Sequence, residues 1–204
     1  MTTSDWTVAD VSNVSGPDLL ARTYIEQRDV RRHVEGYLVD GSCARACDVG
    51  AGYGRMTVVL AEFFDEVYAF ERDVNLSAIG RRLHPEINFT QVATLGELPV
   101  SSSVFDFVLV FTVLQHLTDD EVSPALSEIR RIVKDGAGCL ICEQTDESYV
   151  TGRVEAGYMF TIGRSISRYE ALAHGFALVE TSPRVVQPRG EWCDKGHYML
   201  FRAD

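Results

Sequence analysis

The sequence has no apolar run that reaches the roughly 20 residues a membrane-spanning helix needs. Nor does the segment at residues 1–6 carry the basic and apolar regions of a signal peptide. Repeats and low-complexity segments are also lacking. We therefore expect a cytoplasmic protein that has no membrane partner.

Cysteine is scarce and its count is odd. The five cysteines exclude a complete disulfide framework within one chain. Cys139 and Cys142 have the spacing of a zinc or redox pair, but they lie within an apolar run that is typical of a buried strand. Residues three apart on a strand point to opposite faces, so we expect reduced, structural thiols and no metal.

Basic residues are few compared with acidic ones. The chain has 19 Lys and Arg against 30 Asp and Glu, a formal net charge of −11. Binding to a phosphate backbone is driven largely by Lys and Arg, so we expect no nucleic-acid partner. A neutral or cationic small substrate fits this charge better. The 204 residues suffice for a single domain with a substantial core.

A strand-like run at residues 46–49, which includes the acidic Asp48, leads directly into three alternating glycines, Gly50, Gly52 and Gly54. A strand that ends in glycines lets the backbone approach a ligand closely. The helix that opens after such a loop directs its free N–H groups at the ligand. A tight turn without a ligand is the alternative for this motif alone.

Glu71 ends the next strand-like run, residues 66–71. A carboxylate at the tip of the strand that follows a glycine loop can accept both hydroxyl groups of a ribose. Together the glycine loop and Glu71 therefore predict a pocket for a cofactor that contains a nucleoside.

The spacing of the glycines indicates which cofactor. A dinucleotide fingerprint reads G-x-G-x-x-G, whereas this chain has Asp48 followed by Gly50-x-Gly52-x-Gly54. This D-x-G-x-G-x-G form resembles the first motif of class I S-adenosyl-L-methionine (SAM) methyltransferases. The resemblance implies SAM as cofactor and S-adenosyl-L-homocysteine (SAH) as product. It implies these cofactor-binding residues: Asp48, Gly50, Ala51, Gly52, Gly54, Arg55, Glu71, Arg72, Thr94, Leu95, Phe111 and Thr112.

Strands and helices alternate after residue 44, which favours an α/β fold with a doubly wound, mostly parallel sheet. The pattern predicts strands at about 45–49, 66–71, 87–92, 105–111, 138–144, 176–181 and 196–202. Helices are predicted at about 54–63, up to residue 83, at 118–133 and at 167–175, the last two opened by capping boxes at Thr118 and Ser167. One or two further helices are expected at 17–38, after a loose polar lead-in at 1–16.

The resemblance implies seven strands in the order 3-2-1-4-5-7-6, with the last strand antiparallel and helices on both faces. We expect a single domain over residues 1–204. Residues 1–39 would form an N-terminal helical cap and residues 40–204 a Rossmann-like core. A substrate lid is expected around 144–166.

Two further passages resemble this family. Glu97-Leu98-Pro99 followed by residues 105–110 resembles the passage into strand four, and residues 111–117 resemble the segment after it. The resemblance implies that His116 faces the methyl-transfer cavity. His116 is our first candidate for a general base, with Glu143 behind it, because histidine is the usual proton acceptor at neutral pH. A histidine satisfied by backbone groups is the alternative.

The chain departs from the family after strand three. Many relatives carry an acid there that accepts a hydrogen bond from the adenine amine, but residues 91–97 place no acid directly after the strand. The Thr94 hydroxyl or a backbone carbonyl would substitute for it. The N–H of Thr94 or Leu95 would reach a ring nitrogen.

The acceptor is expected to be a small molecule. The segment after strand four lacks the Asn/Asp-Pro-Pro-aromatic motif and the Pro-Cys nucleophile of nucleobase methyltransferases. We expect the substrate walls to be the N-terminal helix and the 144–166 lid, where any one ring has the alternative of merely covering the core. The candidate substrate residues are Tyr24, Arg28, Tyr149, Tyr158 and Phe160.

The sequence thus predicts a methyltransferase that acts on an oxygen or nitrogen of a small-molecule metabolite, as a monomer or homodimer. Two alternatives stay open. A non-catalytic SAM-binding protein would keep the same binding motifs. A dinucleotide-dependent oxidoreductase would share Glu71, but the glycine spacing and the lack of a second nucleotide-binding half disfavour it.

Overall fold

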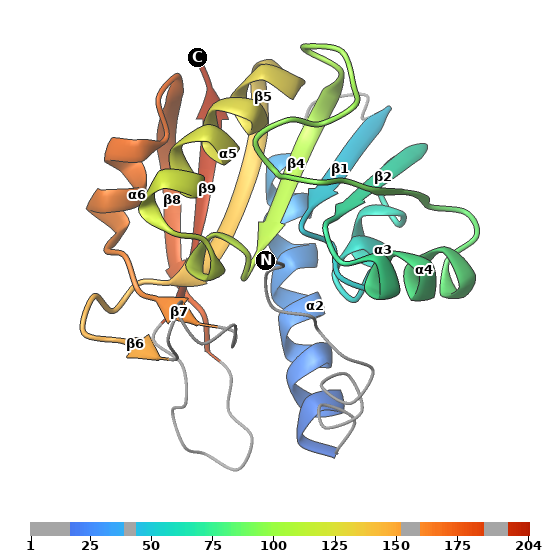
Figure 1. Cartoon of the computed structure of the whole chain (residues 1–204), viewed down its shortest axis with the longest axis horizontal. Helices are drawn as coiled ribbons and strands as arrows, with labels where there is room; N and C mark the ends of the chain where they lie inside the picture. Colours follow the sequence, from blue (N-terminus) through green and yellow to red (C-terminus); the bar gives the residue numbers. More distant parts are fainter. Residues whose placement is uncertain (1–16, 39–43, 152–159, 186–195) are drawn as a thin grey trace.

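The computed structural model describes residues 17–38, 44–151, 160–185 and 196–204 (Figure 1). The expected polar lead-in at 1–16 and the candidate substrate residue Tyr158 lie outside the described residues. No helix in the described part of the chain is both long and apolar enough to cross a membrane.

A seven-stranded sheet forms the centre of the molecule. Its strand order is β3-β2-β1-β4-β5-β9-β8, which confirms the predicted order 3-2-1-4-5-7-6. The first five strands pair in parallel, and β9 pairs antiparallel with both β5 and β8. The strands are β1 (Arg45–Val49), β2 (Glu66–Glu71), β3 (Asn88–Gln91), β4 (Phe105–Phe111), β5 (Val133–Gln144), β8 (Phe176–Pro183) and β9 (Gly196–Ala203).

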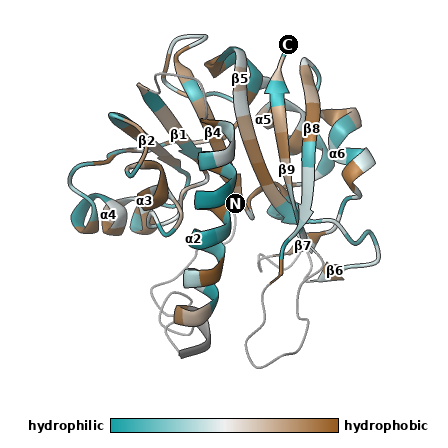
Figure 2. Ribbon diagram, turned by 180° about the vertical axis from the view of Figure 1, so that it is seen from behind, coloured by the Kyte–Doolittle hydropathy of each residue, from teal (hydrophilic) through white to brown (hydrophobic). Residues whose placement is uncertain are grey.

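Helices cover both faces of this sheet, as predicted (Figures 1 and 2). Buried residues of α5 and α6 pack in the apolar cluster on one face, and those of α2 and α3 pack in the cluster on the other. The helices are α2 (Pro17–Tyr37), α3 (Thr57–Leu60), α4 (Val74–Leu83), the short 3₁₀ helix η1 (Leu114–His116), α5 (Asp119–Ile132) and α6 (Ile166–Leu172). A separate antiparallel pair is formed by β6 (Val150–Thr151) and β7 (Thr161–Ile162).

Side chains alternate between the two apolar clusters along β5. Cys139 packs in the cluster under α5, whereas Cys142 packs in the cluster under α2. Both side chains are buried. The two sulfurs therefore face opposite sides of the sheet, as the strand spacing predicted.

Two predicted helix starts and one predicted strand start are wrong. The helix after the glycine loop does not begin at Gly54, because its φ of +95° is incompatible with a helix, and α3 begins only at Thr57. Ser167 does not cap α6, since the helix already begins at Ile166. Helix α5 ends at Ile132, and β5 begins at once because Val133 pairs with Phe105 of β4.

The N-terminal helix and the Thr118 capping box match the prediction better. The apolar pattern at 17–38 corresponds to one continuous helix, α2. At the start of α5 the backbone N–H of Thr118 donates to the Glu121 carboxylate at 2.9 Å, and the reciprocal side-chain bond completes the box.

Candidate active site

The glycine loop lies at the carboxyl end of β1. Gly50, Gly52 and Gly54 have φ values of +81°, +58° and +95°. A Cβ at Gly50 would collide with the Val113 side chain, and one at Gly54 would collide with His84 and a neighbouring ring. Among the described residues, a Cβ at Gly52 would meet nothing within 4 Å. Packing therefore explains the first and third glycines, whereas the open space beside Gly52 fits a ligand.

Glu71 and the glycine loop meet, as the sequence predicted. The Glu71 carboxylate accepts hydrogen bonds from the backbone N–H groups of Gly52 at 2.6 Å and Asp73 at 2.7 Å. Burial raises the pKa of Glu71, although these two donors oppose the shift. The N–H groups of Gly50 and Ala51 donate to the carbonyl of Phe70, so β2 supports both the loop and the acid.

One buried carboxylate oxygen of Asp48 has no hydrogen-bond partner among the described residues. Its Oδ2 accepts a hydrogen bond from the Thr57 hydroxyl at 2.6 Å, but its buried Oδ1 has no partner in the part of the chain that the structure describes. Burial raises the pKa of Asp48 to about 7. An unsatisfied buried oxygen is costly, so a donor from a bound ligand would stabilise this site.

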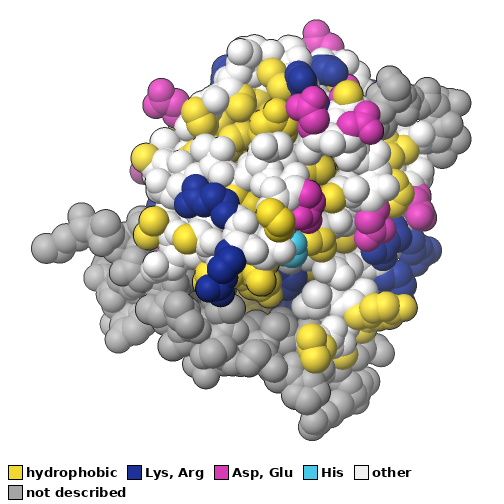
Figure 3. Space-filling model, turned by 90° about the vertical axis from the view of Figure 1, so that its right-hand side faces the viewer, with side chains coloured by type: hydrophobic (Ala, Val, Ile, Leu, Met, Phe, Trp, Pro, Cys, Tyr) yellow, Lys and Arg dark blue, Asp and Glu magenta, His cyan; other side chains and the backbone are white. Residues whose placement is uncertain are grey.

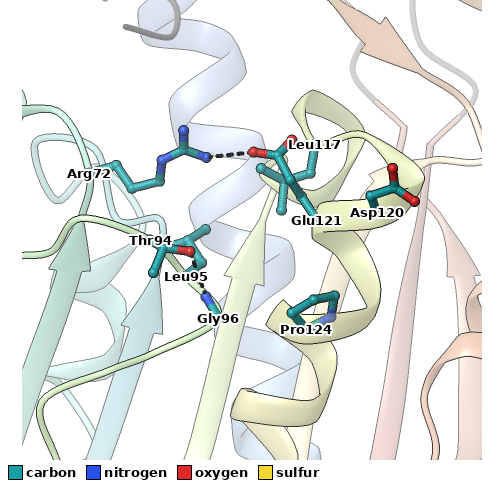
Figure 4. A pocket seen from close by; sticks show the side chains of 8 residues that line it. All are labelled: Arg72, Thr94, Leu95, Gly96, Leu117, Asp120, Glu121 and Pro124. Carbon is teal, nitrogen blue, oxygen red and sulfur yellow. Dashed lines mark hydrogen bonds and ion pairs between the residues drawn. The ribbon is translucent and has the colours of Figure 1, made fainter. Parts of the chain in front are cut away.

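A cavity of about 240 Å³ opens beside Glu71 (Figure 4). Three residues predicted to bind the cofactor line it, namely Arg72, Thr94 and Leu95. Residues from the segment that leads into α5 and from its first turns form the remaining wall: Leu117, Asp120, Glu121 and Pro124, together with Gly96. The structure thus brings the end of β2 and the segment after β3 to one cavity.

Sequence reasoning missed a buried ionic cluster between α2 and the sheet. The carboxylate of Glu26 is fully buried and accepts hydrogen bonds from Arg22 at 3.0 Å, from Arg184 at 3.0 Å and from Arg55. Burial alone would raise the pKa of Glu26, but these arginines lower it to about 2. Arg55 and Arg184 also lie over the ring of Phe111, 5.4 and 5.1 Å from its centroid.

Tyr24 and Arg28 lie on an outer face of α2. Tyr24 is 71% exposed, and Arg28 pairs with the neighbouring Asp29 at 2.8 Å. The two lie one turn apart on an outer face of α2, whereas Glu26 projects toward the sheet. Gln27 also contacts the loop, since its amide donates to the carbonyl of Arg55 at 2.7 Å. The role of Tyr24 and Arg28 as substrate residues therefore stays a prediction.

His116 is the last residue of η1 and contacts the segment before β7. Its Nδ1 lies 2.7 Å from the carbonyl oxygen of Phe160, and its Nε2 lies 3.1 Å from the amide nitrogen of Gln115. A carbonyl only accepts hydrogen bonds, so Nδ1 carries the proton and Nε2 accepts one from Gln115. Burial lowers the pKa of His116, which keeps the ring neutral at pH 7.

Glu143, the second candidate base, lies beneath this turn and is fully buried. Its carboxylate accepts hydrogen bonds from three backbone N–H groups, those of Val113 and Leu114 at 2.9 Å each and of Gln115 at 3.0 Å. Burial raises the pKa of Glu143 to about 7 against these donors. We therefore replace the sequence-based interpretation of Glu143 as a proton acceptor with a positioning role.

Arg164, which sequence reasoning also missed, holds the same turn from the other end. Its guanidinium is 3% exposed and donates to the carbonyls of Leu114 at 2.9 Å and Leu117 at 2.7 Å. It also pairs with Asp119 at 2.8 Å. Because Arg164 directly follows the β7 region, it connects η1 to the predicted lid segment.

The remaining candidates lie around the end of β4 and in the lid segment. Thr112 follows β4 with a φ of +55°, and its N–H donates to the carbonyl of Cys142 at 2.7 Å. Tyr149 is exposed, and Phe160 contributes its carbonyl to His116. The turn at β4 therefore lies next to the glycine loop, through Val113, and to the segment before β7, through His116.

Comparison with known proteins places this site in a family. Residues 47–141, which carry the glycine loop, Glu71 and His116, match a family model described as a methyltransferase domain. No curated protein matches the chain significantly.

Solved structures share the fold at low sequence identity. A SAM-dependent methyltransferase from Leishmania major has a TM-score of 0.74 at 18% identity, over 95% of this chain and 77% of that one. A protein from Pyrococcus horikoshii OT3 has a TM-score of 0.70 at 15% identity, over 90% of this chain and 91% of that one. A TehB-like SAM-dependent methyltransferase from Corynebacterium glutamicum has a TM-score of 0.63 at 19% identity, over 86% and 87%.

The strand order, the glycine loop bound to its partner acid and the family match point to one conclusion. Residues 47–141 carry a methyltransferase domain, and the chain has the fold of the class I S-adenosyl-L-methionine-dependent methyltransferases.

Proposed function

We propose that the protein transfers the methyl group of SAM to an oxygen or nitrogen of a small-molecule metabolite. The observation that carries this proposal is the convergence of three groups at the carboxyl ends of neighbouring strands: the glycine loop after β1, Glu71 at the end of β2 and His116 beyond β4. Ligands of open α/β sheets bind at this edge.

The residues present fit the cofactor. In our proposal Glu71 accepts hydrogen bonds from the ribose hydroxyls, and the loop from Gly50 to Gly54 lies against the methionyl part, where Gly52 leaves open space. The unpartnered Oδ1 of Asp48 offers a buried acceptor there. Ala51, Arg55, Phe111 and Thr112 complete the proposed cofactor site, and Arg72, Thr94 and Leu95 line the cavity for the adenine.

The protein's contribution to the chemistry is alignment and proton removal. A sulfonium methyl group is already electrophilic when bound. Bound SAM would supply that methyl group and leave as SAH, and the chain would fix the acceptor in line with it, which contributes effective molarities of about 10⁵–10⁸ M. Where the acceptor arrives protonated, we propose that Nε2 of His116 takes the proton once the amide of Gln115 turns away.

The small-molecule class rests on charge and on the surroundings of His116. The net charge is −11, and on the face in Figure 3 the Lys and Arg side chains form several separate groups, some of them beside acidic side chains. A continuous basic surface, which a nucleic acid requires, is not visible on that face. We propose that the lid around 144–166 lies over the acceptor, with Tyr149 and Phe160 in its described part and Tyr158 outside it.

The experiment that tests this function measures SAH formation after incubation with SAM and a panel of small molecules, DNA, RNA and proteins. We expect turnover with at least one small molecule. Turnover only with a macromolecule would refute the substrate class. SAM binding without SAH formation from any acceptor would favour a non-catalytic SAM-binding protein.

A further inference from the structure

An ion pair spans the cavity beside Glu71. Arg72, which directly follows Glu71, and Glu121, in the first turn of α5, approach to 3.6 Å. Figure 4 shows the two side chains pointing toward each other, while Thr94 and Leu95 lie below the guanidinium of Arg72. The pair therefore connects the two walls of the cavity, one from the β2 edge and one from α5.

The dimensions and walls of this cavity suit a flat heteroaromatic base. It measures about 240 Å³, and Leu95, Leu117 and Pro124 supply apolar surface. Pockets for such ligands are mostly apolar with a few polar groups that fix orientation. Arg72 directly follows Glu71, the acid proposed to bind the ribose. The base of the same nucleoside would therefore lie in this cavity, next to the ribose. This step rests on the proposed cofactor site.

The two oxygens of Glu121 have separate partners. Oε2 accepts the backbone N–H of Thr118 at 2.9 Å and closes the capping box of α5, whereas Oε1 faces Arg72. The Arg72 and Glu121 side chains are 26% and 43% exposed. Ion pairs this exposed contribute little to folding stability, so stabilising the fold does not account for the contact between Glu121 and Arg72. The capping bond of Glu121, by contrast, does stabilise the fold.

We propose that Glu121 is a positioning residue for the nucleobase of the cofactor. It holds the guanidinium of Arg72 across the mouth of the cavity, where the cation packs against the face of the bound adenine. Guanidinium groups favour aromatic faces, and the contact strengthens when water is excluded. Glu121 acts on the base only through Arg72.

The test is the affinity for SAH, measured by calorimetry, in a variant that separates the two roles. Glu121→Gln keeps a side-chain oxygen for the capping bond, which glutamine also makes, but removes the charge that attracts Arg72. We expect the Kd for SAH to rise about two- to fivefold, the scale of an exposed ion pair, with an unchanged melting temperature. The same factor is expected with 5′-methylthioadenosine, which keeps the base but lacks the amino-acid part.

The matched control is Thr118→Ala, which removes the cap hydroxyl together with its bond to Glu121 but keeps the charges of Arg72 and Glu121. It should lower the melting temperature, since an N-cap side chain contributes about 1 kcal/mol, but leave the Kd for SAH unchanged. A Kd in Thr118→Ala that rises as much as in Glu121→Gln would overturn the proposal, because loss of the cap would then explain both.

A double-mutant cycle shows whether Glu121 acts through Arg72. Arg72→Gln should weaken SAH binding, and adding Glu121→Gln to it should cause no further loss. A full additional loss of SAH affinity in the double variant, or wild-type affinity in Glu121→Gln, would overturn the positioning role of Glu121 alone. Absence of SAH binding by the unaltered protein would overturn both the proposed cofactor site and the positioning role of Glu121.

Discussion

Glu71 binds Gly52 through a hydrogen bond of 2.6 Å from the Gly52 backbone N–H to the Glu71 carboxylate. The bond joins the tip of β2 to the middle of the glycine loop, at the one loop glycine whose missing side chain faces open space. One carboxylate therefore shapes the loop and remains available, through its other lone pairs, to a ligand in that space.

This contact makes the first prediction. Glu71→Ala should weaken SAM binding by a kcal/mol or more, because it removes the proposed ribose acceptor and leaves a loop N–H unpaired. Gly52→Ala should do the same by filling the open space. Calorimetry with SAH measures both effects. Gly136→Ala is the matched control, since Gly136 also has a positive φ of +75° and no atom within 4 Å of its Cβ position. If all three variants bound SAH as tightly as the unaltered protein, the assignment of Glu71 and Gly52 to the SAM site would be contradicted.

Thr94 should matter less. Its hydroxyl accepts a hydrogen bond from the N–H of Gly96 at 3.1 Å, so one of its lone pairs is already engaged. We expect Thr94→Val to weaken SAH binding less than about fivefold, because backbone contacts to the adenine persist and a neutral hydrogen bond contributes about 1 kcal/mol. A loss well beyond tenfold would show that the hydroxyl is the main adenine contact.

His116→Ala should leave SAH affinity unchanged and lower turnover, by about 10²–10⁴-fold if the histidine removes a proton. The loss should shrink at high pH, where the acceptor ionises unaided. Because His116 also donates to the carbonyl of Phe160, His116→Asn is the better variant, since it keeps a donor and has no basic nitrogen. Wild-type turnover by His116→Asn across the pH range would leave alignment as the main catalytic device.

Glu143→Gln should act on the fold instead of on the chemistry. A glutamine oxygen cannot accept from all three N–H groups that surround the carboxylate, so the variant should lose about 1–3 kcal/mol of stability. Thermal unfolding measures this loss, and faster hydrogen exchange at 113–115 would locate it. A stable variant whose pH–rate profile shifts would instead identify Glu143 as the general base.

The free energy of unfolding should fall both when the pH is raised and when it is lowered strongly, because different carboxylates act in the two ranges. Burial raises the pKa of Asp48 and of Glu143 to about 7. Between their ordinary values near 4 and about 7 the folded state holds protons that the unfolded chain has lost, so stability falls as pH rises. The pKa of Glu26 is lowered to about 2, so its contribution is present above about 4.5 and is lost as pH falls toward 2.

The free energy of unfolding should therefore peak at about pH 4, where the gain from Glu26 and the losses from Asp48 and Glu143 balance. Denaturant titrations from pH 3 to pH 8 measure it. Asp48→Asn should flatten the decline above the peak, and Glu26→Gln should flatten the decline below it. A curve that rises steadily to pH 7 and is unchanged in both variants would contradict these shifts.

Local signals in the sequence determined much of the site. The spacing of Gly50, Gly52 and Gly54 indicated a close backbone approach, and the apolar run ending at Glu71 placed an acid beside it in a parallel sheet. These features depend on residues near in sequence and on the rule that parallel strands end at one edge. The capping box at Thr118 is of the same kind, because all its atoms lie within one turn.

Contacts between distant residues were decided by the tertiary structure alone. Glu26 and Arg184 are 158 positions apart, and nothing local distinguishes them from solvated charges. Which face of α2 turns inward, and so leaves Tyr24 exposed, depends on how the helix docks on the sheet. Burial likewise set the role of Glu143: a carboxylate at the end of β5 reads as a base in the sequence, but three backbone N–H groups close over it only once β4 and η1 are in place.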